Sequence, residues 1–402
     1  MNPIIVIGAG LAGWTTVREF RKLDATTPIL MITADSGDFY AKPTLSNAFA
    51  QKKTPAQLVV TPMAKMVETQ GVTMLAHTRV LGFDPYVKTV TTAHGSHDFS
   101  ALVLATGASP IRIPMGGDAA DEVLSVNSLQ DFASFYLALN TDAGRHEKSA
   151  DSYENNSNKK TRVLIMGAGL IGCEFANDLI NAGFAVCVID PSTRPLAALL
   201  PESASEQLRA SLAGLGVDWH FGVTVQTVNR TADTAQPAPL QATLSNGKVL
   251  AADVVLSAIG LRADTQLALA AGLTCERGIV VDTALQTSAP QVYALGDAAQ
   301  YASAGHATLP FVMPIMNAAR ALAATLAGRR TELVFPIMPV AVKTPALPLL
   351  IASPRAGAPG AWRQAEPGWW QHIGEAGRLQ GFILAGVQTA RRAEQVKALQ
   401  AV

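Results

Sequence analysis

Gly8-Ala9-Gly10-Leu11-Ala12-Gly13 decides the fold of this chain, because the motif occurs again as Gly167-Ala168-Gly169-Leu170-Ile171-Gly172. We call these the first and second glycine motifs. Each follows an apolar run, Ile4–Ile7 and Val163–Met166, that reads as a strand. Glycines at this spacing permit a tight turn and bring the backbone close to a pyrophosphate at the amino end of the following helix. We therefore expect one chain to bind two dinucleotides.

A carboxylate follows the second strand expected in each nucleotide-binding unit. Asp190 ends the run Ala185–Ile189, where it would accept hydrogen bonds from the ribose hydroxyls and repel a 2′-phosphate. This predicts NAD at the second motif, and Arg194 nearby keeps NADP open as the alternative. Asp35 follows the run Ile29–Thr33 and has two interpretations, a ribose ligand or a turn residue.

The composition limits which binding partners and which cellular compartment we expect. The 402 residues predict two or three domains, and 31 basic and 31 acidic residues give no overall attraction to nucleic acid or membranes. Cys173, Cys187 and Cys275 form no C-x-x-C pair, which predicts a reduced, cytoplasmic protein without a four-cysteine metal centre. His94 and His97 flank a predicted turn, so no metal site is expected from the seven histidines.

We expect neither a leader nor a membrane segment from the pattern of apolar residues. The run Ile4–Ile7 leads straight into the first glycine motif, which argues against a signal peptide. The longest apolar stretch, residues 333–353, is interrupted by prolines and Lys343, a pattern that a membrane helix does not tolerate.

Alternating strand and helix signals predict an α/β fold with two Rossmann-like dinucleotide-binding domains and a small C-terminal α+β domain. Short strands such as Val340–Val342 and Leu379–Ala385 are expected in that last domain. Runs at 88–92 and 98–104 predict an antiparallel hairpin. The polar stretches 141–160 and 230–240 are interpreted as surface loops, the first of them mobile.

Three further motifs carry a family resemblance. They are Leu104–Pro110, Val255–Gly260 and Val292–Asp297, and with the glycine motifs they resemble the two-dinucleotide flavoproteins typified by glutathione reductase. The resemblance covers nearly the whole chain. It implies FAD at the first motif and NAD(P)H at the second. It also implies an FAD domain at 1–114 and 261–330, an NAD(P)H domain at 115–260 and a C-terminal domain at 331–402.

Within that family the segments 39–46, 166–179 and 339–346 resemble the bacterial rubredoxin reductases. The loop at 141–160 departs from the compact connection of those enzymes. The resemblance implies NADH as electron donor, rubredoxin as acceptor, and a monomer or weak dimer.

The same resemblance implies the site. Lys42 would lie by the flavin and pair with Glu174, whereas residue types alone suggest a surface salt bridge. Asp297 would contact the flavin ribityl chain rather than only cap a helix, and Lys343 is either a second electrostatic group or a surface lysine. The catalytic residues expected are Lys42 and Glu174. The cofactor-binding residues expected are Gly8, Gly10, Leu11, Ala12, Gly13, Asp35, Lys42, Pro43, Val80, Thr106, Gly107, Gly167, Gly169, Leu170, Ile171, Gly172, Glu174, Asp190, Gly260, Gly296, Asp297 and Lys343.

A helix is expected from Pro310 to Gly328, with Pro314 near its start. Its positive amino end would favour negative charge on the flavin pyrimidine. An ordinary core helix explains the pattern equally well.

The cysteine pattern separates the possible functions. Disulfide reductases of this family pass electrons to a dithiol, and peroxide-reducing relatives use a cysteine after Leu-Ser, where this chain has Asn47. The hypothesis is therefore that NADH reduces the flavin, which passes electrons singly to rubredoxin. The alternatives are a reductase of ferredoxin, quinone or oxygen, and an FAD-binding interaction protein resembling apoptosis-inducing factor. Candidate cations for docking an acidic rubredoxin are Lys52, Lys53, Arg320, Arg329 and Arg330.

Overall fold

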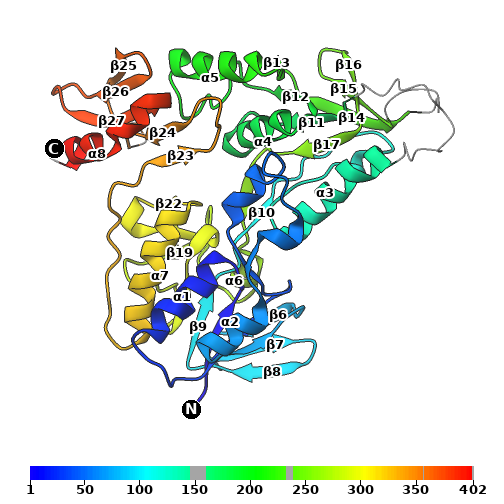
Figure 1. The fold of residues 1–402 in the computed structure, drawn as a ribbon. Coiled ribbons are helices and arrows are strands. Elements are labelled where there is room, and N and C mark those ends of the chain that lie inside the picture. Colours follow the sequence, from blue (N-terminus) through cyan, green and yellow to red (C-terminus); the bar gives the residue numbers. More distant parts are fainter. Residues whose placement is uncertain (145–159, 232–238, 356, 401–402) are drawn as a thin grey trace. The chain divides into compact units, whose positions relative to one another are not determined.

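The computed structural model of the protein describes residues 1–144, 160–231, 239–355 and 357–400 (Figure 1). The chain divides into two compact units, each built from separate segments. The first unit contains Met1–Lys42, Val59–Ser109 and Leu261–Met338, and the second contains Pro43–Leu58, Pro110–Gly260 and Pro339–Val402. The division into three domains remains a prediction.

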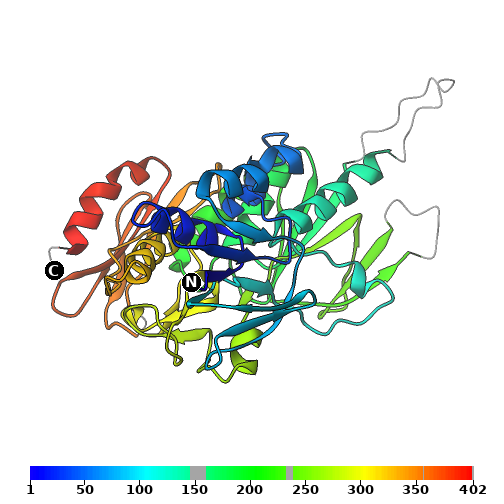
Figure 2. The same ribbon diagram turned by 90° about the horizontal axis from the view of Figure 1, so that it is seen from below.

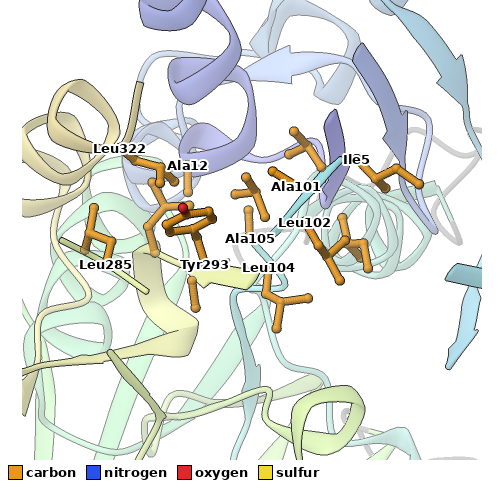
Figure 3. Packing of buried hydrophobic residues seen from close by; sticks show 14 of the residues in the cluster. Ile5, Ala12, Ala101, Leu102, Leu104, Ala105, Leu285, Tyr293 and Leu322 are labelled. Carbon is orange, nitrogen blue, oxygen red and sulfur yellow. The ribbon is translucent and has the colours of Figure 1, made fainter. Parts of the chain in front are cut away.

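A five-stranded parallel sheet forms the centre of the first unit. In spatial order its strands are β20 (Val292–Ala294), β9 (Ala101–Leu104), β1 (Ile4–Ile7), β2 (Ile29–Ile32) and β5 (Thr73–Leu75). Every residue of β1, β2 and β9 is buried, as in strands covered on both faces. Figure 3 shows Ile5 and Leu104 of this sheet in a single apolar core with Leu322 and Tyr293.

Helices pack against this sheet. They are α1 (Leu11–Arg21), α2 (Met63–Gln70), α6 (Gln266–Ala270) and α7 (Val312–Leu326). Helices α1 and α7 lie side by side (Figures 1 and 2). The expected helix at 310–328 is confirmed as α7, since Pro314 lies in its first turn and Gly328 has a left-handed φ of 89° just beyond its end.

Smaller sheets complete the first unit. They comprise β3 (Phe39–Tyr40) with β4 (Val59–Thr61), β6 (Val80–Asp84) with β7 (Thr89–Thr92) and β8 (Gly95–Asp98), and β19 (Ile279–Val281) with β21 (Ala299–Tyr301) and β22 (Ala307–Thr308). Strands β10 (Ala108–Pro110) and β18 (Leu261–Ala263) also pair. The predicted hairpin was wrong in its second strand. Thr89–Thr92 pairs with the polar Gly95–Asp98, while the apolar Ala101–Leu104 joins the buried parallel sheet.

The second unit contains another parallel sheet and an antiparallel one. The parallel sheet has the order β13 (Asp218–Phe221), β12 (Ala185–Asp190), β11 (Arg162–Met166), β17 (Val254–Ser257). The antiparallel sheet consists of β14 (Val225–Arg230), β15 (Leu240–Leu244) and β16 (Val249–Ala252). The helices are α3 (Leu129–Gly144), α4 (Leu170–Asn181) and α5 (Glu202–Gly214).

The C-terminal segment forms a third sheet with a helix on it, as expected for an α+β part. Its order is β23 (Val340–Val342), β24 (Leu349–Ala352), β27 (Leu379–Ala385), β26 (Trp369–Ile373), β25 (Ala361–Glu366), and α8 (Arg392–Gln400) packs on it. Short 3-10 helices lie at Lys42–Asn47, Pro55–Leu58, Ala120–Glu122, Gly296–Ala298, Ala302–Ala304 and Gly386–Arg391. The predicted α/β fold is confirmed.

Both predicted loops are shorter than expected at their edges. Helix α3 continues through residues 141–144. The prediction missed this because a polar helix end and a loop have the same composition. Arg230 and Leu240 pair with each other as the ends of β14 and β15. Residues 145–159 and 232–238, on which the rest of these predictions falls, lie outside the described ranges. Among the described helices, none has both the length and the apolar character needed to span a membrane.

Candidate active site

The first glycine motif forms a tight turn between β1 and α1. Gly8 has a left-handed φ of 106°, and a Cβ on it would collide with the carbonyl oxygen of Ala105. A Cβ on Gly13 would likewise collide with the carbonyl oxygen of Gly8. At Gly10, the N-cap of α1, a Cβ would meet no atom within 4 Å. The turn therefore leaves open space at the amino end of α1, which fits a dinucleotide pyrophosphate.

The second glycine motif repeats this geometry before α4. Gly167 has a φ of 105°, and its Cβ would lie 2.6 Å from the carbonyl oxygen of Ala258. Gly169 again faces open space, while Gly172 packs against the Gly167 carbonyl. Neither α1 nor α4 has an acidic residue in its first turn, so the positive end of each helix dipole remains available to an anion.

Asp190 closes back onto the second glycine motif. Its Oδ2 accepts a hydrogen bond from Ala168 N at 2.6 Å, and its Oδ1 accepts one from Ser192 N at 2.7 Å. This holds the carboxylate beside the turn that would carry the pyrophosphate. The Arg194 guanidinium donates instead to two carbonyls of its own loop, at 3.4 Å each. This arrangement supports the preference for NAD over NADP.

The Asp35 carboxylate bonds within its own turn, whereas that of Asp190 bonds to a glycine motif. Its Oδ1 accepts hydrogen bonds from Thr33 Oγ1 at 2.6 Å and from Gly37 N at 3.1 Å, both within the turn that follows β2. The geometry favours the turn interpretation of this residue, and its contact with a ribose stays a prediction.

The carboxyl end of β20 comes up against the first glycine motif. Gly296 has a φ of 79°, and its Cβ would lie only 2.8 Å from the Cβ of Ala12. The Tyr301 hydroxyl fixes this turn by accepting from Gly296 N at 2.8 Å and donating to Gly296 O at 3.2 Å. Burial raises the pKa of Tyr301, which keeps the hydroxyl protonated as that donor. Asp297 follows directly, in the 3-10 helix Gly296–Ala298.

Two other predicted strand-end turns also have defined partners. Thr106 Oγ1 donates to Asp264 O at 3.0 Å, and Asp264 N donates to Gly107 O at 3.0 Å, which ties the turn after β9 to the segment after β18. Gly260 has a φ of 113° and accepts from Ile111 N at 3.0 Å. Val80 is buried at the start of β6. Their roles in cofactor binding stay predictions.

Lys42 lies with Asp297 in the first unit. Its Nζ is 3.4 Å from Asp297 Oδ2, and the side chains are 35% and 13% exposed. Lys42 is the first residue of the 3-10 helix Lys42–Asn47, in which Pro43 comes second.

Glu174 lies with Lys343 in the second unit. The Lys343 ammonium forms a close ion pair with Glu174 Oε2, while Lys343 N donates to Oε1 at 2.9 Å. Ser46 Oγ donates to Glu174 Oε2 at 2.6 Å, and Lys343 Nζ also donates to Pro43 O at 2.9 Å. The partner of Glu174 within its own unit is thus Lys343, which favours an electrostatic role for this lysine over that of an unpaired surface residue. The predicted pairing of Lys42 with Glu174 would join the two units and stays a prediction.

Sequence reasoning missed two neighbours of Glu174 on α4. Asp178 accepts from Phe49 N at 2.9 Å and from Ala50 N at 3.0 Å, and Asn177 Oδ1 accepts from Ala346 N at 2.9 Å. Burial raises the pKa of Asp178 to about 6, although these hydrogen bonds oppose the rise. The signal was present as polar residues at helix spacings of three and four in a buried helix. Together they hold segments 46–50 and 343–346 on α4.

Two Rossmann-like units, each with an open glycine turn at a helix amino end, define a protein that binds two dinucleotides. Residues 2–323 match the family model described as pyridine nucleotide-disulphide oxidoreductase, and the chain belongs to that family, whose members bind FAD and NAD. Residues 332–399 match the model described as the rubredoxin binding C-terminal domain.

Two relatives and one solved structure define the likeness further. The chain is 44% identical to a rubredoxin-NAD(+) reductase of Alcanivorax borkumensis, covering 100% of both chains. It is 40% identical to one of Acinetobacter baylyi, covering 98% of this chain and 96% of the relative. In fold it resembles putidaredoxin reductase in its covalent complex with putidaredoxin, with a TM-score of 0.84 and 22% identity, covering 99% and 93% of the two chains.

Proposed function

We propose that this protein is an FAD-dependent, cytoplasmic enzyme that passes electrons from NADH to rubredoxin. The observation that carries the proposal is the rubredoxin binding C-terminal domain at 332–399, joined to a chain that is similar over its full length to rubredoxin-NAD(+) reductases. The cytoplasmic location is supported by three cysteines that are all free thiols.

We assign FAD to the first glycine motif and NADH to the second. The open turn at Gly10 and the amino end of α1 would hold the FAD pyrophosphate, with Asp297 and Lys42 beside it. The turn at Gly169 and the Asp190 carboxylate would hold NADH. FAD, when bound, supplies the conversion of an electron pair into single electrons. The chain supplies orientation and charge.

The thiols support an acceptor outside the chain. Cys173 is wholly buried, and burial raises its pKa, so it is not a reactive thiolate. The position after Ser46 is Asn47, at the end of a 3-10 helix. A disulfide relay would need two adjacent thiols. The electrons would therefore pass directly from the flavin to a partner protein.

Docking would depend on local cations, because the chain has no net charge. Lys52, Arg320 and Arg329 are exposed, while Arg330 is paired with Asp282 at 2.8 Å. If the exposed cations steer an acidic rubredoxin, its reduction should slow as ionic strength rises. A rate that does not change with salt would contradict steering by these cations.

The proposal is tested by a panel of acceptors. FAD-loaded protein is supplied with NADH and, separately, with rubredoxin, a ferredoxin, a quinone or oxygen, and NADH consumption is measured. The highest kcat/KM is expected with rubredoxin. A higher value with another acceptor would select the alternative reductases. Slow NADH oxidation with every acceptor would select the interaction protein.

A further inference from the structure

Three side chains with metal-ligating atoms lie on one face of the second unit's parallel sheet. In the register of β12 and β13, Cys187 lies opposite Asp218, and Ile189 lies opposite His220. Alternate residues of a strand share a face, so the pairing brings Cys187, Asp218 and His220 together. Within the described part of the chain, this is the one such group of three or more Cys, His, Asp or Glu ligands.

The distances suit a single small ion. The ligand atoms all lie within 4.8 Å of one another, and His220 Nε2 is 3.0 Å from Asp218 Oδ2. Tetrahedral zinc with ordinary bond lengths separates nitrogen, oxygen and sulfur ligands by about 3.4–3.6 Å. Small side-chain rotations would therefore bring all three atoms onto one ion. The Asp218 side chain is 67% exposed and that of His220 is 12% exposed, which leaves a path from solvent.

We propose that Cys187, Asp218 and His220 form a Zn²⁺ site whose fourth position is taken by water. Sulfur and imidazole ligands favour zinc over Mg²⁺ or Ca²⁺, which prefer sites built from oxygen alone. On binding, the thiol S–H bond breaks, an S–Zn bond forms, and one proton leaves to solvent without any change of oxidation state.

The same three residue types also occur in enzymes with a nucleophilic cysteine, but the pKa of the Cys187 thiol argues against that role here. Burial raises the pKa of Cys187 to about 12, and the Asp218 carboxylate adds to the rise. A reactive cysteine needs a lowered pKa. The exposed Lys248 is the cation that opposes this rise, and its long side chain can move aside when an ion enters.

The site would tie an edge strand to its neighbour. β13 is the outer strand of its sheet, and β12 ends at Asp190, which is bonded to the second glycine motif. Bound zinc would therefore stabilise the strand that positions the predicted ribose ligand. This inference is independent of the electron acceptor.

Cobalt binding tests the site, because Co²⁺ replaces Zn²⁺ and reports its ligands by absorption. FAD-loaded protein without a histidine tag is titrated with Co²⁺ under reducing conditions, and difference spectra are recorded against the same protein without metal. One Co²⁺ per chain is expected, with a sulfur-to-cobalt charge-transfer band. Absence of that band at a large excess of Co²⁺ would overturn the proposal.

Variants assign the ligands. Cys187→Ser should abolish the sulfur band, and Asp218→Asn and His220→Gln should weaken binding roughly 10- to 100-fold. The matched controls Cys275→Ser and His94→Gln change a half-buried thiol and an exposed imidazole outside the cluster and should leave the spectrum unchanged. Because Asp218 is mostly exposed, its substitution tests the site without disturbing the core. A spectrum unaffected by Cys187→Ser would also overturn the proposal.

Discussion

The two glycine motifs share one backbone geometry, but the residues that follow them are used differently. Both turns collide with a Cβ at the first and third glycines and leave open space at the second. In the second motif Asp190 bonds back to Ala168, whereas after the first motif Asp35 bonds within its own turn. The glycines thus set the backbone geometry expected of a pyrophosphate site, while the position of the acid depends on the path of the chain after the second strand.

The helices after the two motifs also differ. At the place where α4 carries the buried Glu174, α1 carries Thr15, which contacts Met316 Sδ at 3.8 Å. At the place of Asp178, α1 carries Glu19, which pairs with Lys22. The second helix has therefore become a polar clamp for distant segments, while the first packs against α7.

The largest effect is expected from filling the open space at each middle glycine. Gly10→Val should leave the fold intact but remove FAD, because its side chain would occupy the approach to the amino end of α1. Gly169→Val should retain FAD and raise the KM for NADH roughly 100-fold. The flavin absorbance per chain and NADH kinetics measure both effects. If Gly169→Val loses FAD as well, the two motifs do not serve separate nucleotides.

The two ion pairs should differ in their effect on stability. Glu174→Gln leaves the Lys343 ammonium without its buried partner and should cost about 3–5 kcal/mol. Lys42→Met removes one longer contact, 3.4 Å from Asp297 Oδ2, between side chains that are 35% and 13% exposed, and should cost less than about 1 kcal/mol. Denaturant unfolding of the FAD-loaded proteins measures the difference. A loss of unfolding free energy for Glu174→Gln no larger than that for Lys42→Met would mean that the ion pair of Glu174 with Lys343 does not add to the stability of the second unit.

Asp178 should make stability depend on pH. Its pKa is raised from 3.8 to about 6 in the folded protein, so the stabilisation linked to its proton is present below about pH 4 and is lost as pH rises through about 6. The free energy of unfolding linked to this proton changes by about 3 kcal/mol in total. The Tm of the wild type, measured relative to that of Asp178→Asn, should therefore fall between about pH 4 and 6. The matched control Glu19→Gln, at the equivalent position of α1 where Glu19 pairs with Lys22, should show no such change. A pH-independent difference for Asp178→Asn would contradict the prediction.

The smallest effect is expected from the two acids. Asp190→Asn replaces one acceptor oxygen by an amide that cannot accept from backbone N–H, so the KM for NADH should rise about tenfold. Asp35→Asn should leave the FAD content unchanged, because its contacts serve a turn. Flavin release under mild denaturant provides the comparison. Easier release from Asp35→Asn would restore its role as a ribose ligand.

The sequence predicted the parts of the site that depend on local geometry. Gly8 and Gly167 require left-handed backbone at a strand end, which is visible in the order of residue types. The α7 boundaries were predictable for the same reason, from Pro314 and Gly328.

Long-range partners were not predictable. Nothing near Glu174 in the sequence indicates that Lys343 takes its carboxylate, because that pairing depends on where the C-terminal segment crosses α4. The proposed zinc ligands could not be predicted either, because only the register of two parallel strands brings Cys187 beside Asp218 and His220. The hairpin error has a local cause, since Ala101–Leu104 is apolar at every position and belongs in a buried strand.

A single-turnover experiment tests the central proposal most directly. FAD-loaded protein is mixed without oxygen with one equivalent of NADH in a stopped-flow instrument, and then with oxidised rubredoxin. The account predicts fast bleaching of the flavin absorbance, followed by its return as rubredoxin is reduced. Flavin that stays oxidised with NADH, or that stays bleached in the presence of rubredoxin, would contradict it.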